Sequence, residues 1–114
     1  MSEVSRGESS DVSVTVDPEA TKVCVRGRLD VTTVADVREL LHSAVDHGNG
    51  DLHVDLTDLE LVDATGLGLL LGAHRRAGRA GRRLVLHAVP ARVHRLLLAT
   101  RLDRVLTLDD AAVA

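Results

Sequence analysis

Alternating apolar and polar residues predict a β-hairpin near the start of the chain. Between residues 12 and 16, valine occupies every second position and serine or threonine stands between, which is the two-residue period of a half-buried strand. This run ends at the turn-forming pair Asp17-Pro18. A second run covers residues 22–28, and the short polar connection before it favours antiparallel pairing of the two strands.

The spacing of apolar residues lengthens from two to about 3.6 after Asp30, which predicts an amphipathic helix. Thr32 or Thr33 is placed to cap its N-terminus, and Gly48 is placed to end it in the left-handed conformation. The apolar positions that form the inner face of this helix are Val34, Val37, Leu41, Ala44 and Val45.

The rest of the chain continues to alternate strands with helices. Residues 51–56 predict a third strand, and residues 61–81 contain a helix that begins with buried leucines and ends with solvated arginines. Residues 83–87 predict a fourth strand, Pro90 suits the first position of a third helix, and residues 105–108 predict a last short strand. This order predicts an α/β fold, with one mixed sheet of four to five strands and crossover helices packed against it.

The chain is expected to form a single domain from residue 11 to residue 114. Its 114 residues suit one hydrophobic core, and residues 1–10 are polar and serine-rich, which predicts a disordered tail. The longest nearly apolar stretch, residues 66–73, is far shorter than the roughly 20 residues that span a bilayer. With a single cysteine, Cys24, and no signal-peptide pattern, the sequence favours the cytoplasm and no insertion into a membrane.

Composition removes several classes of function. The chain has no Phe, Tyr or Trp, which excludes base stacking on aromatic residues, aromatic cages and most sugar-binding platforms. Charge is segregated, because residues 1–63 contain 5 Lys or Arg against 14 Asp or Glu, and residues 64–114 contain 9 against 3. Five arginines between residues 75 and 83 could contact nucleic-acid phosphates. The simpler interpretation is a solvated helix C-terminus, and no nucleic-acid partner is expected.

Four short motifs carry a resemblance to a known family. They are Gly27-Arg28-Leu29-Asp30, Val54-Asp55-Leu56, Leu61-Val62-Asp63-Ala64-Thr65-Gly66-Leu67-Gly68 and Leu102-Asp103-Arg104-Val105-Leu106. Through these motifs, residues from about 11 to 108 resemble the STAS domains of anti-sigma factor antagonists and sulfate transporters. The resemblance implies a STAS-type fold and a regulatory binding protein that is not an enzyme.

The resemblance also implies a phosphorylation site. In that family, the hydroxyl residue directly before the glycine of an Asp-Ser/Thr-Ser/Thr-Gly-Leu turn accepts a phosphoryl group. The matching residue is Thr65, and Ala64 replaces the first of the two hydroxyl residues. The implied partner is an anti-sigma factor of the serine/threonine kinase type, which binds around Thr65 until phosphorylation ends the interaction, and no cofactor is implied. The expected surroundings of the site are Asp30, Thr32, Thr33, Asp63, Ala64, Gly66 and Leu67.

Elementary electrostatics is compatible with a switch at this turn. A hydroxyl at the start of a helix lies beside unpaired backbone N–H groups and the positive end of the helix dipole, where a phosphate is tolerated. Phosphorylation adds about −1.5 to −2 charges, and the resemblance places Asp30 and Asp63 beside them. Gly66 is expected to let another molecule approach the turn closely.

Other interpretations of the same residues stay open. Thr65 could serve only as a helix cap, and a STAS domain without phosphorylation could act as a scaffold or as a soluble subunit of a membrane transporter. An enzyme would use Asp30, Asp55 and Asp63 to hold Mg²⁺ or as a carboxylate pair. The six histidines are scattered and show no metal-ligand spacing, so no metal site is expected. The oligomeric state is left open between a monomer and a weak dimer.

Overall fold

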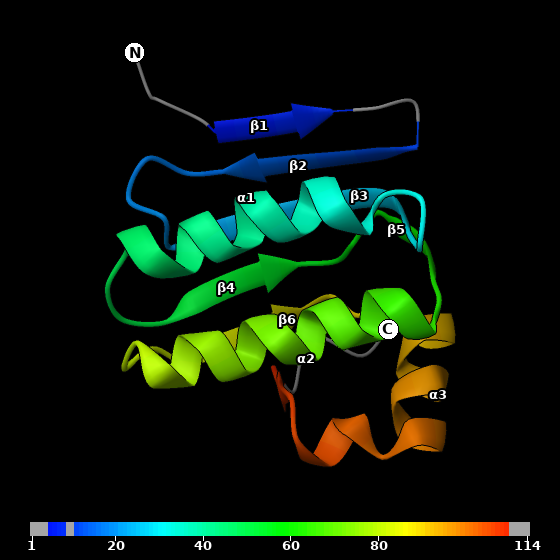
Figure 1. The fold of residues 1–114 in the computed structure, drawn as a ribbon. Helices are drawn as coiled ribbons and strands as arrows, with labels where there is room; N and C mark the ends of the chain where they lie inside the picture. The colour runs from blue at the N-terminus through cyan, green and yellow to red at the C-terminus, as the bar shows by residue number, and fades with distance from the viewer. Residues whose placement is uncertain (1–4, 9–10, 110–114) are drawn as a thin grey trace.

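Strands and helices alternate along most of the chain, as the hydrophobic pattern predicts (Figure 1). The computed structural model of the protein describes residues 5–8 and 11–109. In these residues the strands are β1 (Ser5–Glu8), β2 (Val12–Val16), β3 (Lys22–Leu29), β4 (Leu52–Asp55), β5 (Leu59–Val62), β6 (Leu84–His87) and β7 (Thr107–Leu108). The helices are α1 (Val34–His47), α2 (Ala64–Arg79) and α3 (Ala91–Thr100), followed by a 3₁₀ turn, η1 (Leu102–Arg104).

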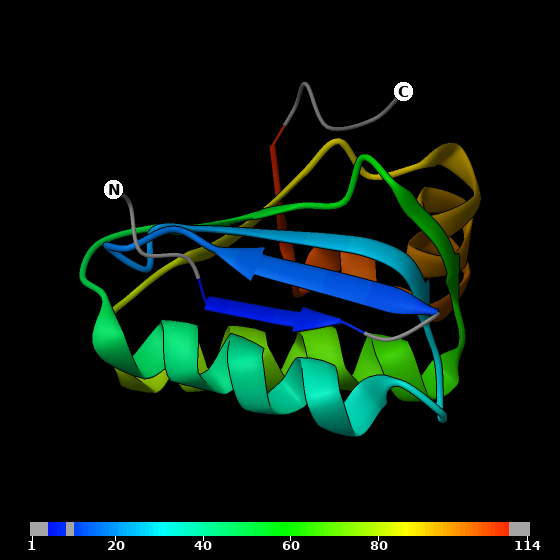
Figure 2. The same ribbon diagram turned by 90° about the horizontal axis from the view of Figure 1, so that it is seen from above.

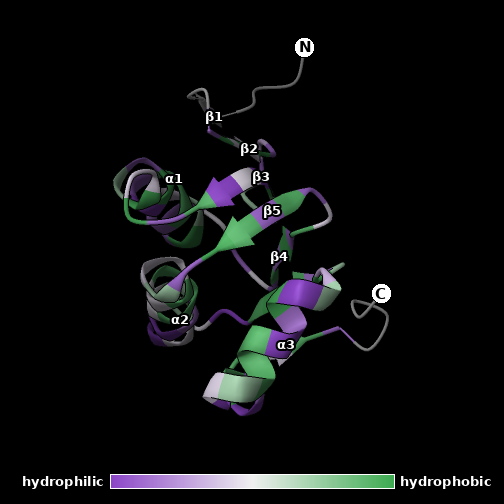
Figure 3. Ribbon diagram, turned by 90° about the vertical axis from the view of Figure 1, so that its right-hand side faces the viewer, coloured by the Kyte–Doolittle hydropathy of each residue, from purple (hydrophilic) through white to green (hydrophobic). Residues whose placement is uncertain are grey.

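All of these strands join one mixed sheet, with α-helices on both faces. The strand order is β1-β2-β3-β4-β6-β7, and β5 pairs with β3 outside this path. The pairs among β1, β2 and β3 are antiparallel, and the remaining pairs are parallel. Helices α1 and α2 lie side by side on one face, and α3 lies on the other (Figure 2 and Figure 3). The predicted α/β fold with a β2–β3 hairpin is therefore confirmed.

The sheet has seven strands, whereas four to five were predicted. The prediction of a disordered tail over residues 1–10 is wrong for Ser5–Glu8, which forms β1 and pairs with β2. Residues 1–4 and 9–10 lie outside the described residues. Strand β5 was also missed. Strand β1 contains no large apolar side chain. In β5 the buried residues are Leu59 and Val62, three positions apart, so neither strand shows the two-residue alternation of a half-buried strand.

Strand β3 pairs with two strands in succession on one side. Its residues Lys22–Cys24 pair with β4, and Gly27–Leu29 pair with β5. The register of the β5 pairing shifts between Gly27 and Arg28. Gly27 has φ +92°, and a Cβ atom there would lie 2.3 Å from the carbonyl oxygen of Asp11. Only glycine fits this irregularity. As a result, β5 ends beside the C-terminal end of β3.

Arg82 lies inside the protein and connects the end of α1 to the β2–β3 turn. The prediction that the arginines between residues 75 and 83 are solvated is therefore wrong for Arg82. The residue is only 6% exposed. Its guanidinium donates hydrogen bonds to the carbonyl oxygens of Ala44 and Val45 at 2.8 and 3.0 Å, and to those of Ala20 and Gly50 at 2.7 and 2.8 Å. Burial lowers the pKa of Arg82. This side chain therefore satisfies carbonyl groups at the C-terminus of α1.

Gly48 follows α1 as predicted, but for a different physical reason. Its backbone is extended, with φ −110° and ψ 178°, and not left-handed as expected. A Cβ atom on Gly48 would lie 2.4 Å from the carbonyl oxygen of Ala20 and 2.8 Å from the guanidinium nitrogens of Arg82. Glycine is needed at this position because other parts of the chain approach it closely.

Helix α3 ends in a left-handed residue that is not glycine. Arg101 ends the helix with φ 62°, in the left-handed region, and its N–H donates to carbonyl oxygens of the last turn. Glycine adopts this conformation without a steric penalty, so the position favours glycine. Within the described part of the chain, no helix has both the length and the apolar character needed to cross a membrane.

Candidate functional site

The N-termini of α1 and α2 lie at the same edge of the sheet (Figure 3). The strands that precede them, β3 and β5, are parallel neighbours that end together at Leu29 and Val62. The connections to the two helices, residues 30–33 and Asp63, are therefore adjacent. The backbone N–H of Asp63 donates to the carbonyl oxygen of Leu29 at 3.3 Å. The residues expected around the phosphorylation site all lie in these two connections and the first turn of α2.

Asp30 and two threonines hold the β3–α1 connection in one conformation. The carboxylate of Asp30 accepts hydrogen bonds from the N–H of Thr32 at 2.9 Å and from its hydroxyl at 2.6 Å. The hydroxyl of Thr33 donates to the carbonyl oxygen of Arg28 at 2.8 Å and accepts from the N–H of Asp30 at 3.1 Å. Thr33 thus occupies the N-cap position of α1 without forming a cap hydrogen bond. Asp30 and Thr33 are buried, and their hydrogen bonds fix the connection.

The surroundings of Asp30 favour its ionised form. The hydrogen bond from the Thr32 hydroxyl lowers the pKa of Asp30 against the opposing effect of burial, and the nearby guanidinium of Arg28 lowers it further. A guanidinium nitrogen of Arg28 lies 3.3 Å from the carboxylate, and only 9% of the Asp30 side chain is exposed. Asp30 is therefore a largely covered carboxylate at neutral pH, with one oxygen bonded to Thr32 and the other paired with Arg28.

Asp63 connects the loop after β3 to the first turn of α2. One carboxylate oxygen, Oδ1, accepts a hydrogen bond from the N–H of Gly66 at 2.9 Å, so Asp63 is the cap of α2. The other, Oδ2, accepts from the N–H of Val31 at 3.3 Å. The alternative in which Thr65 caps this helix is therefore wrong.

Gly66 and Leu67 face the interior, which corrects the expectation that Gly66 leaves room for another molecule. Both residues are buried. A Cβ atom on Gly66 would lie 2.4 Å from the carbonyl oxygen of Leu29 and 2.6 Å from a methyl group of Val62. The close approach that Gly66 permits is thus between α2 and the end of β3. Gly66 and Leu67 position the turn and present no side chain to a partner.

Thr65 and Ala64 are the exposed residues of this turn. They lie in the first turn of a helix of 16 residues, where backbone N–H groups lack helical partners and the dipole is positive. Among the described residues, none forms a hydrogen bond with the hydroxyl of Thr65. The geometry therefore offers a hydroxyl that a phosphoryl donor can reach from solvent.

Val31 belongs to the same edge and was missed by sequence reasoning. Its side chain is 68% exposed, although valine elsewhere in the chain is mostly buried. The signal available in the sequence was its place between Asp30 and Thr32, before the apolar period of α1 begins.

The three carboxylates considered for an enzyme each accept hydrogen bonds that hold a turn. Asp55, at the end of β4, accepts hydrogen bonds from the N–H and the hydroxyl of Thr57 at 2.8 and 2.6 Å. These bonds lower the pKa of Asp55. Asp30 and Asp63 are engaged as described above. Over residues 5–8 and 11–109, no three His, Cys, Asp or Glu side chains are grouped so that they could hold a metal ion.

Two of the histidines that are scattered in sequence meet across β4 and β6. His53 Nδ1 lies 2.7 Å from His87 Nε2, and His87 Nδ1 lies 2.9 Å from the carboxylate of Asp109. The sequence could not show this contact, because it depends on the parallel register of the two strands. The two histidines line a hollow of about 480 Å³ together with Thr21, Lys22 and Asp55.

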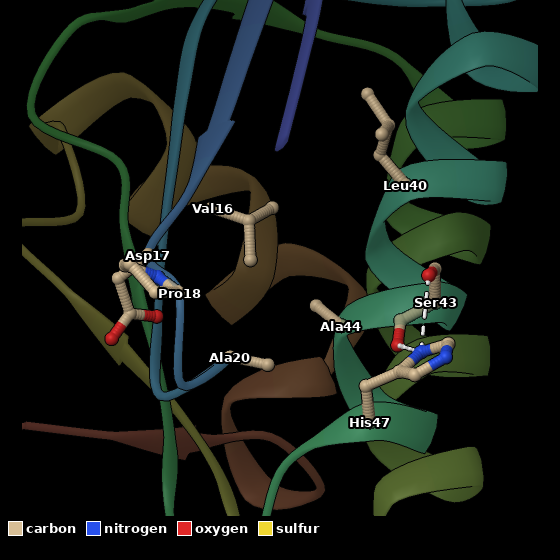
Figure 4. Close-up of a pocket in the computed structure, with 8 residues that line it drawn as sticks. All are labelled: Val16, Asp17, Pro18, Ala20, Leu40, Ser43, Ala44 and His47. Carbon is tan, nitrogen blue, oxygen red and sulfur yellow. Dashed lines mark hydrogen bonds between the residues drawn. The ribbon is translucent and has the colours of Figure 1, made fainter. Parts of the chain in front are cut away.

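Another hollow, of about 270 Å³, lies between the β2–β3 turn and the C-terminal half of α1 (Figure 4). Its polar side chains are engaged with neighbouring residues. Asp17 accepts hydrogen bonds from Thr21 and from the N–H of Lys22, and His47 Nδ1 lies 2.7 Å from the carbonyl oxygen of Ser43. This hollow is at the opposite end of α1 from the exposed hydroxyl and is separate from the candidate site.

Several arginines near the end of α2 are engaged within the protein. Arg76 forms two hydrogen bonds with Asp46 of α1, at 2.9 and 2.7 Å. Arg83 pairs with Asp51 at 2.8 Å, and Arg82 is buried. The run of five arginines therefore does not form a continuous cationic surface.

Comparison with known proteins identifies relatives over most of the chain. A family model described as "Mlab, STAS domain" matches residues 12–108. The anti-sigma-B factor antagonist of Staphylococcus epidermidis is 33% identical over 89 residues, which cover 78% of this chain and 82% of that protein.

Solved structures share the fold at lower identity. An anti-sigma-factor antagonist (STAS) domain protein from Planctomyces limnophilus matches with a TM-score of 0.69 at 21% identity, over 87% of this chain and 89% of that one. The phosphorylated form of SpoIIAA, a Bacillus cell fate determinant, matches with a TM-score of 0.60 at 17% identity, over 94% and 91% of the two chains. At these identities the likeness shows the fold alone.

Proposed function

The chain belongs to the STAS domain family of anti-sigma factor antagonists, and from this premise we propose that it binds an anti-sigma factor and thereby frees a sigma factor. The binding surface is the edge formed by residues 30–33 and the first turn of α2. The anti-sigma factor is a serine/threonine kinase, and its transfer of a phosphoryl group from ATP to Thr65 ends the interaction. In this scheme the protein acts in the cytoplasm, needs no cofactor and catalyses no reaction itself.

The observation that carries this proposal is the exposed hydroxyl of Thr65 in the first turn of α2. The cap formed by Asp63 and the packing of Gly66 fix this turn, so a kinase can reach the hydroxyl without unfolding the helix. The relatives support the partner, because the Staphylococcus epidermidis protein is an anti-sigma-B factor antagonist. SpoIIAA, which shares the fold, has been solved in a phosphorylated form, so a phosphorylated state is compatible with this fold.

A phosphate on Thr65 would weaken binding because the partner excludes the water that screens its charge in the free protein. The dianion adds about −1.5 to −2 charges close to the carboxylate of Asp63, and a bound partner removes the water that screens the two. At an effective dielectric constant of about 20, unit charges about 6 Å apart repel by roughly 3 kcal/mol. Half of that energy corresponds to about a tenfold loss of affinity. A change of charge is therefore enough to act as the switch, with no change of fold.

The test uses purified protein and the anti-sigma factor kinases of the same organism. Each kinase is incubated with the protein and MgATP, and modification is located by mass spectrometry of the intact chain and its peptides. Binding is measured without ATP by calorimetry for wild type, Thr65→Ala and Thr65→Asp. We expect one phosphoryl group on Thr65, wild-type binding by Thr65→Ala, and binding weakened about tenfold or more by Thr65→Asp.

Thr65→Ser is the matched control, since it keeps a hydroxyl at the same position and should be both bound and phosphorylated. Tight binding by Thr65→Asp would show that charge at this position does not operate the switch. Binding without modification by every cognate kinase would favour the scaffold interpretation of the STAS domain.

A further inference from the structure

Val31 stands out because it is the most exposed large aliphatic side chain in the described residues. Its side chain is 68% exposed, and only Leu98 and Val105 are also exposed, at 49% and 46%. Single exposed aliphatic residues are common on protein surfaces. What distinguishes Val31 is the rigidity of its backbone and its position at the candidate site.

Hydrogen bonds on both sides hold the backbone of Val31 in place. Its own N–H donates to Asp63 Oδ2 at 3.3 Å. The preceding residue, Asp30, accepts at its carbonyl oxygen from the N–H groups of Thr33 and Val34 at 3.1 and 2.9 Å. The side chain is β-branched and has one rotatable torsion. Little conformational freedom is left to lose when a partner covers it.

The position of Val31 makes it a neighbour of the phosphorylatable turn. Asp63, which bonds to the N–H of Val31, directly precedes Ala64 and Thr65. Ala64 is also exposed, and its side chain is a single methyl group. The edge therefore presents two apolar side chains beside the hydroxyl of Thr65.

Carboxylates belong to the same two segments as these apolar side chains. Asp63 is partly exposed, and Asp36 is exposed in the first turn of α1, which starts at the same edge of the sheet. A surface that fits this edge has an apolar depression with lysine or arginine at its rim.

We propose that Val31 and Ala64 form the apolar contact through which the protein binds its anti-sigma factor, in a depression with a basic rim close to the kinase active site. This inference rests on the proposed function. The contact provides affinity and Thr65 provides the switch. The two are coupled because a phosphate dianion on Thr65 keeps water at the edge of the apolar contact, which must be dry to be favourable.

The experiment measures binding of the cognate anti-sigma factor by calorimetry at low and high salt, using variants at position 31. Val31→Ala removes two methyl groups and should weaken binding about tenfold if both are buried. Val31→Thr keeps the shape and introduces a hydroxyl, so it should weaken binding to an intermediate extent. The factor lost in Val31→Ala should be the same at both salt concentrations, whereas the affinity of wild type should fall as salt rises.

Val105→Ala is the matched control, because it shortens another exposed valine at a distant place in the chain and should bind like wild type. Circular dichroism checks that each variant folds, and little change in stability is expected from an exposed position. Equal affinity of wild type and Val31→Ala would overturn the inference and leave the proposed function intact. Equal weakening by Val105→Ala would also overturn it. Failure of wild type to bind any cognate anti-sigma factor would instead contradict the proposed function.

Discussion

Replacing Arg82 with methionine tests whether one buried guanidinium holds α1 to the β2–β3 turn. Arg82 donates four hydrogen bonds of 2.7 to 3.0 Å to carbonyl oxygens on three segments: the end of α1, the residues after it and the β2–β3 turn. Methionine fills much of the same volume and has no donor. The variant therefore leaves the four carbonyl groups without this partner.

The expected effect on stability follows from those four groups. Three of the bonds, to Ala44, Val45 and Ala20, are buried, and each carbonyl that loses such a partner costs about 1 kcal/mol at the low end of the usual range, which gives about 3 kcal/mol. The bond to Gly50 is partly exposed and adds less. Part of this is offset, because methionine has no charge to bury, so we expect a net loss of about 2–3 kcal/mol. Domains of this size are stabilised by only about 5–15 kcal/mol. The urea midpoint should therefore fall by about 1–2 M.

Urea denaturation followed by far-ultraviolet circular dichroism measures this change, since the chain has no tryptophan or tyrosine whose fluorescence could report unfolding. Arg83→Met is the matched control. Arg83 is the next residue, its side chain is 64% exposed, and its replacement should leave the midpoint nearly unchanged. If Arg82→Met and Arg83→Met unfold at the same urea concentration, the hydrogen bonds of Arg82 do not stabilise the fold and the reasoning is refuted.

Two further predictions concern carboxylates. Asp63→Asn keeps an oxygen for the N–H of Gly66 and loses only the acceptor for Val31, so its unfolding free energy should stay near that of wild type. Asp63→Ala loses both acceptors and should unfold with about 1 kcal/mol less free energy. Equal losses for the two variants in urea denaturation would contradict the capping role. The hydrogen bond from Arg76 lowers the pKa of Asp46 below 3.8, so the folded state is stabilised above that pH and this contribution is lost as the pH falls through the lowered pKa. The urea midpoint of wild type should decline below about pH 4, and that of Asp46→Asn should decline less steeply. An identical decline in the two proteins would show that the Arg76–Asp46 pair does not contribute to this pH dependence.

The sequence predicted the elements with clear periodicity and missed those without it. Alternating valines identified β2, and the 3.6-residue spacing identified α1, because one face of each is buried. Arg82 follows exposed arginines in sequence, and nothing local shows that it turns inward to bond with carbonyl groups brought by three other segments. The contact between His53 and His87 likewise depends on strand register.

The resemblance located the candidate site in the sequence, but only the structure showed the role of each residue there. Position 65 was identified correctly as part of the turn at the start of α2, and its exposure could not be read from the sequence. Gly66 was assigned to the approach of another molecule, whereas the approach is internal, from the end of β3. The spacing of Asp63 and Gly66 contained the available signal, because an aspartate three residues before a helical N–H is a common N-cap.

The structure separates the residues of the motif into those that the fold requires and those that face solvent. Asp63 caps α2, and Gly66 lets that helix pack against β3, so both residues have a structural role in this chain. Ala64 and Thr65 are exposed and have no such constraint. If the proposed switch operates, its specificity lies at these two positions. A chain with the same aspartate and glycine but alanine at position 65 would fold in the same way and could not be switched by phosphorylation there.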